Sequence, residues 1–154
     1  MAGTFDFATL HVVIGGVHRV TGRAKGDSVS VVYDNDSFTK TTGVDGNGYF
    51  TKIADRSATV TLTLGLDSPS NPVLSVLHNA DLAAPGGLLV PVSIRDAAGN
   101  TAYFTTGARV MKLADGVWSD GGNNRVWTIG TISMNGFVGR LNATALAPAA
   151  LLAA

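Results

Sequence analysis

The residues that could bind a metal ion are few and unsuitably spaced. The chain has no cysteine, and its three histidines are His11, His18 and His78. Two of them fall in predicted strands and one in a predicted helix, and no pair has the short spacing of zinc ligands. Around residue 46 the sequence imitates the middle of a calcium loop, but Gly43 and Ala54 stand where oxygen ligands are needed. The sequence therefore predicts no metal site.

Catalytic groups are no better placed. Asp34 and Asp36 are neighbouring carboxylates, but they lie between a predicted strand and a predicted turn, where aspartate is common. Serine and threonine are plentiful, yet none lies in a nucleophile elbow. The pairs Gly15-Gly16 and Gly121-Gly122 lack the spacing and the lysine of a phosphate-binding loop. We therefore expect no catalytic residue, no cofactor and no enzymatic activity.

The charge content points to self-association. Eleven basic residues balance eleven acidic ones, which argues against a general nucleic-acid binder. Only 14% of the 154 residues are charged, against about 25% in an average soluble domain. Such a chain has too little charge to cover the surface of a free monomer, so we expect much of its surface to be buried against other subunits.

The two ends of the chain carry no targeting or membrane signal. No basic region precedes the apolar stretch at the N-terminus, and no apolar run approaches the ~20 residues of a membrane helix. We therefore expect no membrane partner. The segment 141–154 is uncharged and rich in alanine and leucine. The sequence predicts a single β domain over 1–140, followed by an apolar C-terminal tail over 141–154.

The elements that hold these residues are predicted to be mainly strands. Glutamate and glutamine, both good helix formers, are absent, whereas valine and threonine suit strands and 19 glycines suit turns. A bulge is expected at Gly107. The expected strands cover 7–14, 17–21, 28–33, 37–42, 49–53, 58–66, 88–95, 101–106, 108–113 and 125–134.

One segment has helical spacing. Asn71 followed by Pro72 fits an N-cap and the first position of a helix. An apolar stripe at i, i+3, i+4 and i+7 is expected to pack on the sheet; its members are Val73, Val76, Leu77 and Ala80.

The segment 37–53 is predicted to form a hairpin that lacks a core of its own. Its tight turn is indicated by Asp45-Gly46 and Asn47-Gly48, which tolerate positive φ. Its arms are mostly serine, threonine and lysine, with few large apolar residues such as Phe38 and Tyr49. We therefore expect the hairpin to project toward a neighbouring subunit, with contacts from Phe38, Asp45, Gly46, Asn47, Gly48 and Tyr49.

Two predicted strands have a polar but uncharged face. In 58–66, apolar side chains alternate with Thr59, Thr61 and Thr63, so one face belongs to the core and the other does not. In 28–33, Ser28 and Ser30 form a similar hydroxyl face.

The order of these segments resembles a family of small bacteriophage structural proteins, the tail tube proteins of contractile-tailed phages. The resemblance runs from about Phe5 to Met134. It is carried by 26–52, DRSATVTLTL at 55–64, SPSNPVLSVLHNAD at 68–81, PVSIRDAAGNT at 91–101 and NNRVWTI at 123–129.

The resemblance implies a small antiparallel β-barrel or sandwich with one flanking helix. It also implies six copies in a ring, and stacked rings that form a hollow tube through which DNA leaves the capsid. The implied partners are further copies of the chain, the tail sheath, and baseplate or terminator proteins, with DNA as transient cargo. The implied location is the virion tail, after assembly in the host cytoplasm.

A DNA-conducting lumen should carry few cations, because each one that neutralises a phosphate adds affinity. We therefore expect Ser28, Ser30, Thr59, Thr61 and Thr63 to line part of the lumen. Basic residues such as Arg56, Arg109 and Arg125 should then pair with aspartates between subunits.

A module that binds carbohydrates or receptors, on a virion or an adhesin, is the alternative. Trp118 lies beside Asp115 and Asp120, and an exposed aromatic ring next to carboxylates suits a sugar site.

Overall fold

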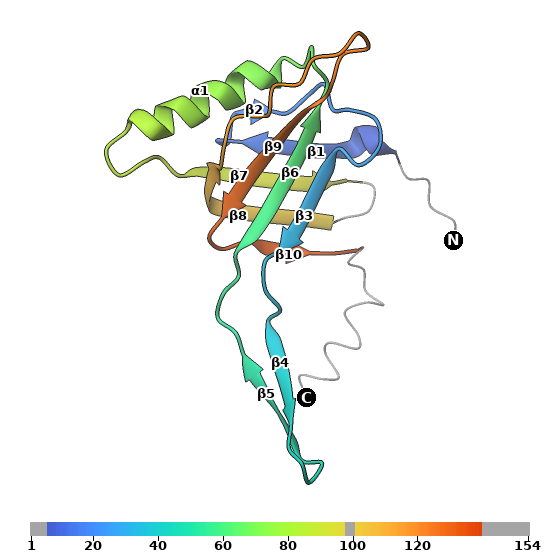
Figure 1. Cartoon of the computed structure of the whole chain (residues 1–154), viewed down its shortest axis with the longest axis vertical. Coiled ribbons are helices and arrows are strands. Elements are labelled where there is room, and N and C mark those ends of the chain that lie inside the picture. The colour runs from blue at the N-terminus through green and yellow to red at the C-terminus, as the bar shows by residue number, and fades with distance from the viewer. Residues whose placement is uncertain (1–5, 98–100, 140–154) are drawn as a thin grey trace.

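The computed structural model describes residues 6–97 and 101–139, so the predicted tail at 141–154 lies outside the described residues. Within these ranges the chain is mainly β with one α-helix and antiparallel pairing, as predicted (Figure 1). The elements are η1 Phe7–Thr9, β1 Leu10–Ile14, β2 His18–Arg19, β3 Val29–Tyr33, β4 Phe38–Thr42, β5 Gly48–Lys52, β6 Ala58–Leu64, α1 Ser70–Ala83, β7 Val90–Asp96, β8 Thr101–Val110, β9 Arg125–Thr131 and β10 Asn135–Phe137.

Eight of the strands form one sheet that folds over on itself at β8. The strand order is β2-β1-β7-β8-β9-β6-β3, and β10 also pairs with β8. Opposite β7, the register slips so that Val90 faces Ala108 but Val92 faces Thr105, which places an extra residue of β8 next to Gly107. This confirms the predicted bulge, and a bulge bends the strand that holds it. Because of the bend, β3, β6 and β9 cross over β1, β7 and β8 (Figure 1).

The sheet remains open, which corrects the closed-barrel form of the prediction. Its end strands, β2 and β3, do not pair with each other in the described part of the chain. The hairpin β4–β5 forms a separate two-stranded sheet and does not extend the main one. It extends away from the body along the long axis of the molecule (Figure 1).

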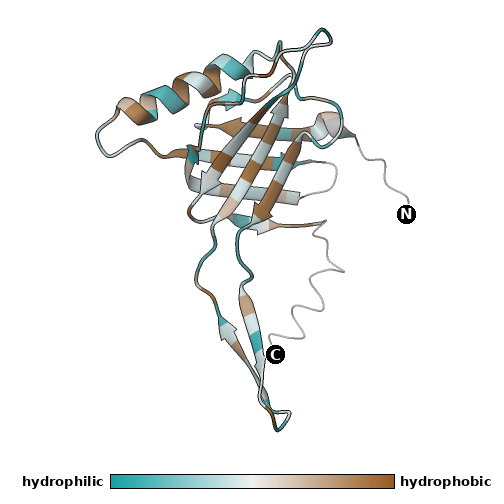
Figure 2. Ribbon diagram, viewed as in Figure 1, coloured by the Kyte–Doolittle hydropathy of each residue, from teal (hydrophilic) through white to brown (hydrophobic). Residues whose placement is uncertain are grey.

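The core lies between the two layers of the folded sheet. Along β6, buried and half-buried residues alternate, and Val60, Leu62 and Leu64 are fully buried. Each such side chain contributes roughly 1.5–3 kcal/mol by leaving water. Leu66 was expected on the same face, but it is 49% exposed because β6 ends at Leu64. Figure 2 shows most of the strongly hydrophobic residues in the strands, whereas the link from β3 into the hairpin is hydrophilic.

The helix packs in a different phase from the predicted one. It begins at Ser70, with Pro69 at the N-cap position, so Asn71 is inside the helix and does not cap it. Leu74 is fully buried and Leu77 packs against the core, whereas Val76 is 66% exposed. The predicted stripe missed this phase because the inward face is partly polar. Nδ1 of His78 lies 2.9 Å from the carbonyl oxygen of Val110, so a polar side chain occupies the inward face that the prediction reserved for apolar residues.

Candidate functional site

The outer face of the sheet layer β3-β6-β9 carries hydroxyl groups in register. Ser30 of β3 lies opposite Thr61 of β6, which lies opposite Thr128 of β9. In such a row the three side chains point to the same face. Thr59 and Thr63 flank Thr61 on this face, because side chains alternate along a strand. We call Ser30, Thr59, Thr61, Thr63 and Thr128 the threonine face; all five are half-buried.

The threonine face itself is uncharged, and the neighbouring Asp34 is hydrogen-bonded to it. The hydroxyl of Thr59 donates to Oδ1 of Asp34 at 2.9 Å, just beyond the end of β3. Next to Thr59 in register lies Gly130 of β9, which has no side chain. The face also carries two exposed apolar side chains, Val32 opposite Thr59 and Val126 opposite Thr63. An uncharged surface of this kind offers a polyanion no cation to bind, so its chemistry suits a passive wall.

Ser28 does not belong to the threonine face, contrary to the prediction. Its relative exposure is 1%, and it lies just before β3 begins. The alternation that places Ser30 outside therefore does not extend to Ser28. Its carbonyl accepts a hydrogen bond from the backbone N–H of Thr63 at 2.8 Å, so the residue serves the sheet itself.

A groove of about 580 Å³ runs along the edge of the threonine face toward β8. Gly130 forms part of its floor, and a Cβ there would come within 2.6 Å of the sulfur of Met111. Its other walls include Leu89, Arg109 and Ile132. The groove therefore joins the threonine face to a rim of mixed character, with apolar side chains at Leu89 and Ile132 and cations at Arg109 and Lys112.

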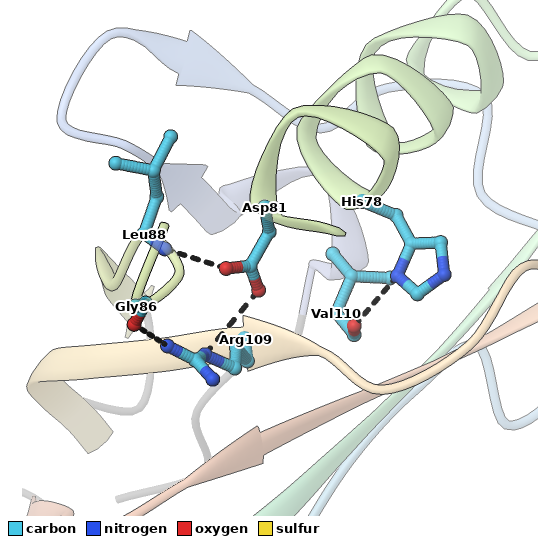
Figure 3. A network of polar contacts seen from close by, with 6 residues as sticks. All are labelled: His78, Asp81, Gly86, Leu88, Arg109 and Val110. Atoms are coloured by element: carbon cyan, nitrogen blue, oxygen red, sulfur yellow. Dashed lines mark hydrogen bonds and ion pairs between the residues drawn. The ribbon is translucent and has the colours of Figure 1, made fainter. Parts of the chain in front are cut away.

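Arg109 is held inside its own chain (Figure 3). Its Nε lies 3.3 Å from Oδ2 of Asp81 on α1, and its Nη2 donates to the carbonyl of Gly86 at 3.4 Å. The other carboxylate oxygen of Asp81 accepts from the backbone N–H of Leu88. The guanidinium is partly exposed, so the ion pair itself contributes only about 0–1 kcal/mol. Gly87 has φ +76°, and a Cβ there would clash with Arg109.

The predicted pairing of arginines with aspartates of other subunits is therefore wrong for Arg109, whose carboxylate partner is its own Asp81. Arg125 is also engaged within the chain. Its Nη1 donates to the carbonyl of Val117 at 3.0 Å, and its guanidinium lies 5.3 Å from the centroid of the Trp118 ring. Arg56 is exposed.

The turn of the hairpin is stabilised by its own polar groups. Asn47 donates from its side chain to Oδ2 of Asp45 at 2.9 Å, and Gly43 donates from its backbone to the carbonyl of Asn47 at 2.7 Å. Gly46 has φ +86°, as a tight turn requires. All ten strand residues of β4 and β5 are exposed, Phe38 and Tyr49 among them. These residues are together on one projection, as the sequence predicted them to be, and their solvent-facing aromatic rings are available to a partner.

The base of the hairpin is fastened by a carboxylate. Asn35 donates to Oδ2 of Asp55 at 2.6 Å, across the two chain segments that lead into the hairpin. The backbone N–H of Ser57 donates to Oδ1 of the same residue at 2.9 Å. Hydrogen bonds from Ser57 and then from Asn35 lower the pKa of Asp55, because they favour its charged form.

The three histidines do not converge, and two of them contact other elements of the fold. They lie on β1, β2 and α1; Nε2 of His18 is 3.0 Å from the hydroxyl of Ser70, and His78 contacts Val110. Among the described residues, no group of three metal-ligating side chains comes together. No helix in the same part of the chain is long and apolar enough to cross a membrane.

Sequence reasoning missed two sets of outward-facing residues. Thr128 joins the threonine face, and the alternation in VWTIGT could have revealed it. Lys40, Phe50 and Lys52 complete the hairpin surface, and the strand alternation of that segment was available as a signal. Trp118, which the sequence analysis considered as an exposed ring beside Asp115 and Asp120, is 78% exposed.

Comparison with known proteins gives the chain a family. Residues 4–139 match the family model described as "Bacteriophage PhiTE tail tube protein". The chain is 32% identical over 122 residues to "Structural protein ORF10" of Pseudomonas phage KPP10. The aligned residues cover 77% of this chain and 69% of that protein.

Solved structures share the fold at low sequence identity. The anti-feeding prophage tube terminating cap superposes with a TM-score of 0.62 at 12% identity, over 90% of this chain and 94% of that one. The sheath/tube terminator of the PVC extracellular contractile injection system gives 0.58 at 14%, over 88% and 97%. The PVC sheath-tube complex gives 0.59 at 13%, over 88% and 92%. The family match covers most of the chain and agrees with the resemblance in the sequence, and this chain belongs to the bacteriophage PhiTE tail tube protein family.

Proposed function

We propose that this protein is the structural, non-enzymatic subunit of a phage tail tube, in which six copies close into a ring and rings stack into a hollow tube. The threonine face is the observation that carries the proposal. It is an uncharged surface of hydroxyl groups interspersed with Val32 and Val126, and it lies on a sheet whose end strand β3 pairs only with β6 among the described strands. A free strand edge invites pairing with another chain, and closure into a ring removes it.

We assign the threonine face to the lumen of the tube. DNA has to slide through without capture, and cations that neutralise phosphates would hold it. The members of this face, Ser30, Thr59, Thr61, Thr63 and Thr128, are uncharged. The nearby Arg109 is already paired with Asp81, which reduces its attraction for a phosphate.

We assign the hairpin to contacts between subunits. Its exposed residues Phe38 and Tyr49 and its turn, Asp45, Gly46, Asn47 and Gly48, reach beyond the body of the molecule. Domain 1–140 would act as one unit that carries this hairpin into a neighbouring copy.

The further partners are proposed from the solved structures that share this fold. The similar solved structures are described as a tube terminating cap, a sheath/tube terminator and a sheath-tube complex. By analogy this chain would contact a contractile sheath, and a terminator or baseplate protein at the ends of the tube. It would act in the virion tail after assembly in the host cytoplasm, with DNA as transient cargo.

Negative-stain electron microscopy of the purified full chain tests the proposal. We expect rings with six-fold symmetry, and stacks of them with a central channel. Monomers or trimers at every concentration would contradict the tube and favour the alternative, a module that binds carbohydrates or receptors.

A further inference from the structure

The hairpin has two chemically different faces. In its register, Phe38 lies opposite Lys52 and Lys40 lies opposite Phe50. Opposed residues point to the same side of a two-stranded sheet, and alternate residues share a side. One face therefore carries two phenylalanines and two lysines in a diagonal pattern, whereas the other carries threonines and Tyr49. We call Phe38, Lys40, Phe50 and Lys52 the Phe/Lys face.

The Phe/Lys face has the exposed aromatic rings and the lysines of a binding surface. Phe38 is 60% exposed and Phe50 is 76% exposed, because the hairpin has no core in which to bury their rings. Neither lysine has an ion pair among the described residues. A surface of aromatic rings and free cations fits a partner surface that is apolar and carries carboxylates.

The opposite end of the molecule has that chemistry. The loop between β8 and β9 and the turn between β6 and α1 lie at the end of the long axis away from the hairpin (Figure 1). They expose four large apolar side chains: Leu66, Leu113, Val117 and Trp118. Two exposed carboxylates, Asp67 and Asp120, lie in the same segments. We call these six residues the Trp118 surface.

The Trp118 surface is held in shape by contacts within the chain. Arg125 fixes the loop by its hydrogen bond to the Val117 carbonyl and by its position over the Trp118 ring. Gly116 lies so close to that ring that a Cβ would come within 2.8 Å of it. Beside the loop is a pocket of about 280 Å³, whose lining combines apolar side chains, Leu66, Leu113, Ala114 and Trp127, with the polar Asn71, Ser75 and Arg125. The surface therefore offers a preformed hollow to an incoming side chain.

We propose that the Phe/Lys face of one copy docks on the Trp118 surface of a second copy in the adjacent ring. The two surfaces lie at opposite ends of the long axis, so the Phe/Lys face of a chain cannot reach the Trp118 surface of the same chain. Head-to-tail stacking of two copies brings the two surfaces together. Lys40 and Lys52 meet Asp67 and Asp120, and the phenylalanines cover the exposed apolar side chains. This inference rests on the proposed tube, and it adds which surfaces join one ring to the next.

Cysteine cross-linking tests the contact directly, because the chain has no cysteine of its own. The variant carries Phe50→Cys and Trp118→Cys, two exposed positions, and preformed assemblies are treated with a short bismaleimide. We expect a ladder of linked chains that continues past six, since each copy is joined to one in the next ring. The matched control replaces Val17, which is 92% exposed, in place of Trp118 and should remain unlinked.

Each result decides between the alternatives. A ladder that stops at the number of copies in one ring would place the hairpin on a neighbour within the ring and overturn the inference. Intact tubes without any linkage would overturn it as well and leave the proposed function standing. If the wild-type chain forms no stacked rings, the proposed function fails, and this inference fails with it.

Charge reversal supplies an independent test. Lys40→Asp with Lys52→Asp should abolish tube growth while leaving the melting temperature of the subunit unchanged, because both side chains are exposed. Adding Asp67→Lys and Asp120→Lys should restore growth. If the fourfold variant forms no more tubes than the hairpin variant, these charges do not face one another.

Discussion

The indole N–H of Trp127 on β9 donates to Oδ1 of Asn71 on α1 at 3.0 Å. Trp127 is 3% exposed, so this acceptor satisfies a donor on a nearly buried side chain. The side-chain amide of Asn71 donates in turn to the carbonyl of Gly65 at 3.0 Å. One asparagine thereby ties the first turn of the helix to two places in the sheet layer that carries the threonine face.

Asn71→Ala should lower the free energy of unfolding by about 1–3 kcal/mol, because it leaves a buried donor unsatisfied. Urea denaturation measures the change. Asn79→Ala is the matched control, since Asn79 is exposed on the same helix and its replacement should be neutral or slightly stabilising. Equal effects of the two variants would show that the Trp127 contact contributes nothing.

Leu74→Ala should be the most damaging truncation in the helix. Leu74 is fully buried, and such a truncation costs about 2–5 kcal/mol. Leu77→Ala should cost less, because Leu77 is half-buried at the edge of the core, and Val76→Ala should cost least. Thermal unfolding of the three variants gives the order. A larger loss at Val76 than at Leu74 would mean that the helix packs in the phase predicted from the sequence.

Replacing 38–52 by a tight turn should leave the subunit folded and stop its assembly. The strands β4 and β5 pair only with each other in the described part of the chain, so the main sheet loses no ladder partner. We expect an unchanged melting temperature by circular dichroism and no tubes by electron microscopy. Normal tubes from the shortened chain would show that the hairpin is only a surface loop.

Thr61→Lys should turn a neutral lumen into one that captures DNA. A ring of six would gain six cations at one level, and stacked rings would repeat them. The wild-type assembly should not retard duplex DNA in a gel even at low salt, whereas the variant should. Its affinity should fall with a slope of about −0.9 in log salt for each phosphate neutralised.

Val17→Lys is the control for this prediction, because it adds the same charge at an exposed turn away from the threonine face. Strong, salt-sensitive DNA binding by the wild-type assembly would count against a conducting lumen and favour a protein that coats DNA.

Acid should loosen the base of the hairpin. The folded-state pKa of Asp55 is lowered, so the stabilisation from its hydrogen bonds is present above the unfolded value of about 3.9. It is lost as the pH falls through the lowered folded pKa. An NMR titration of Asp55 measures that pKa directly. Ser57→Ala removes the side-chain hydrogen bond of Ser57 but keeps its backbone N–H, so it should raise the pKa only part of the way toward 3.9, and Asn35→Ala should do the same. A titration unmoved by both would contradict the assignment.

The sequence alone determined the elements in which local pattern and tertiary environment agree. The alternation of valine and leucine with threonine in 58–64 predicts both the strand and its two faces, because a half-buried strand requires that period. The turn at 45–48 follows from residues that tolerate positive φ. The family could also be identified from the sequence, because the order of these segments spans most of the chain.

Only the tertiary structure decided where strands begin, which face of the helix is buried and how distant elements are placed. Ser28 and Ser30 are equivalent in the sequence pattern, but only Ser30 lies within β3, and where a strand begins depends on its partner. The helix turned His78 and Asp81 inward because Val110 and Arg109 of β8 offered them polar partners. The open sheet and the placing of the hairpin and the β8–β9 loop at opposite ends arise from the fold-over at the β8 bulge and from long-range pairing. Those relationships join residues far apart in the chain, so no local window of sequence contains them.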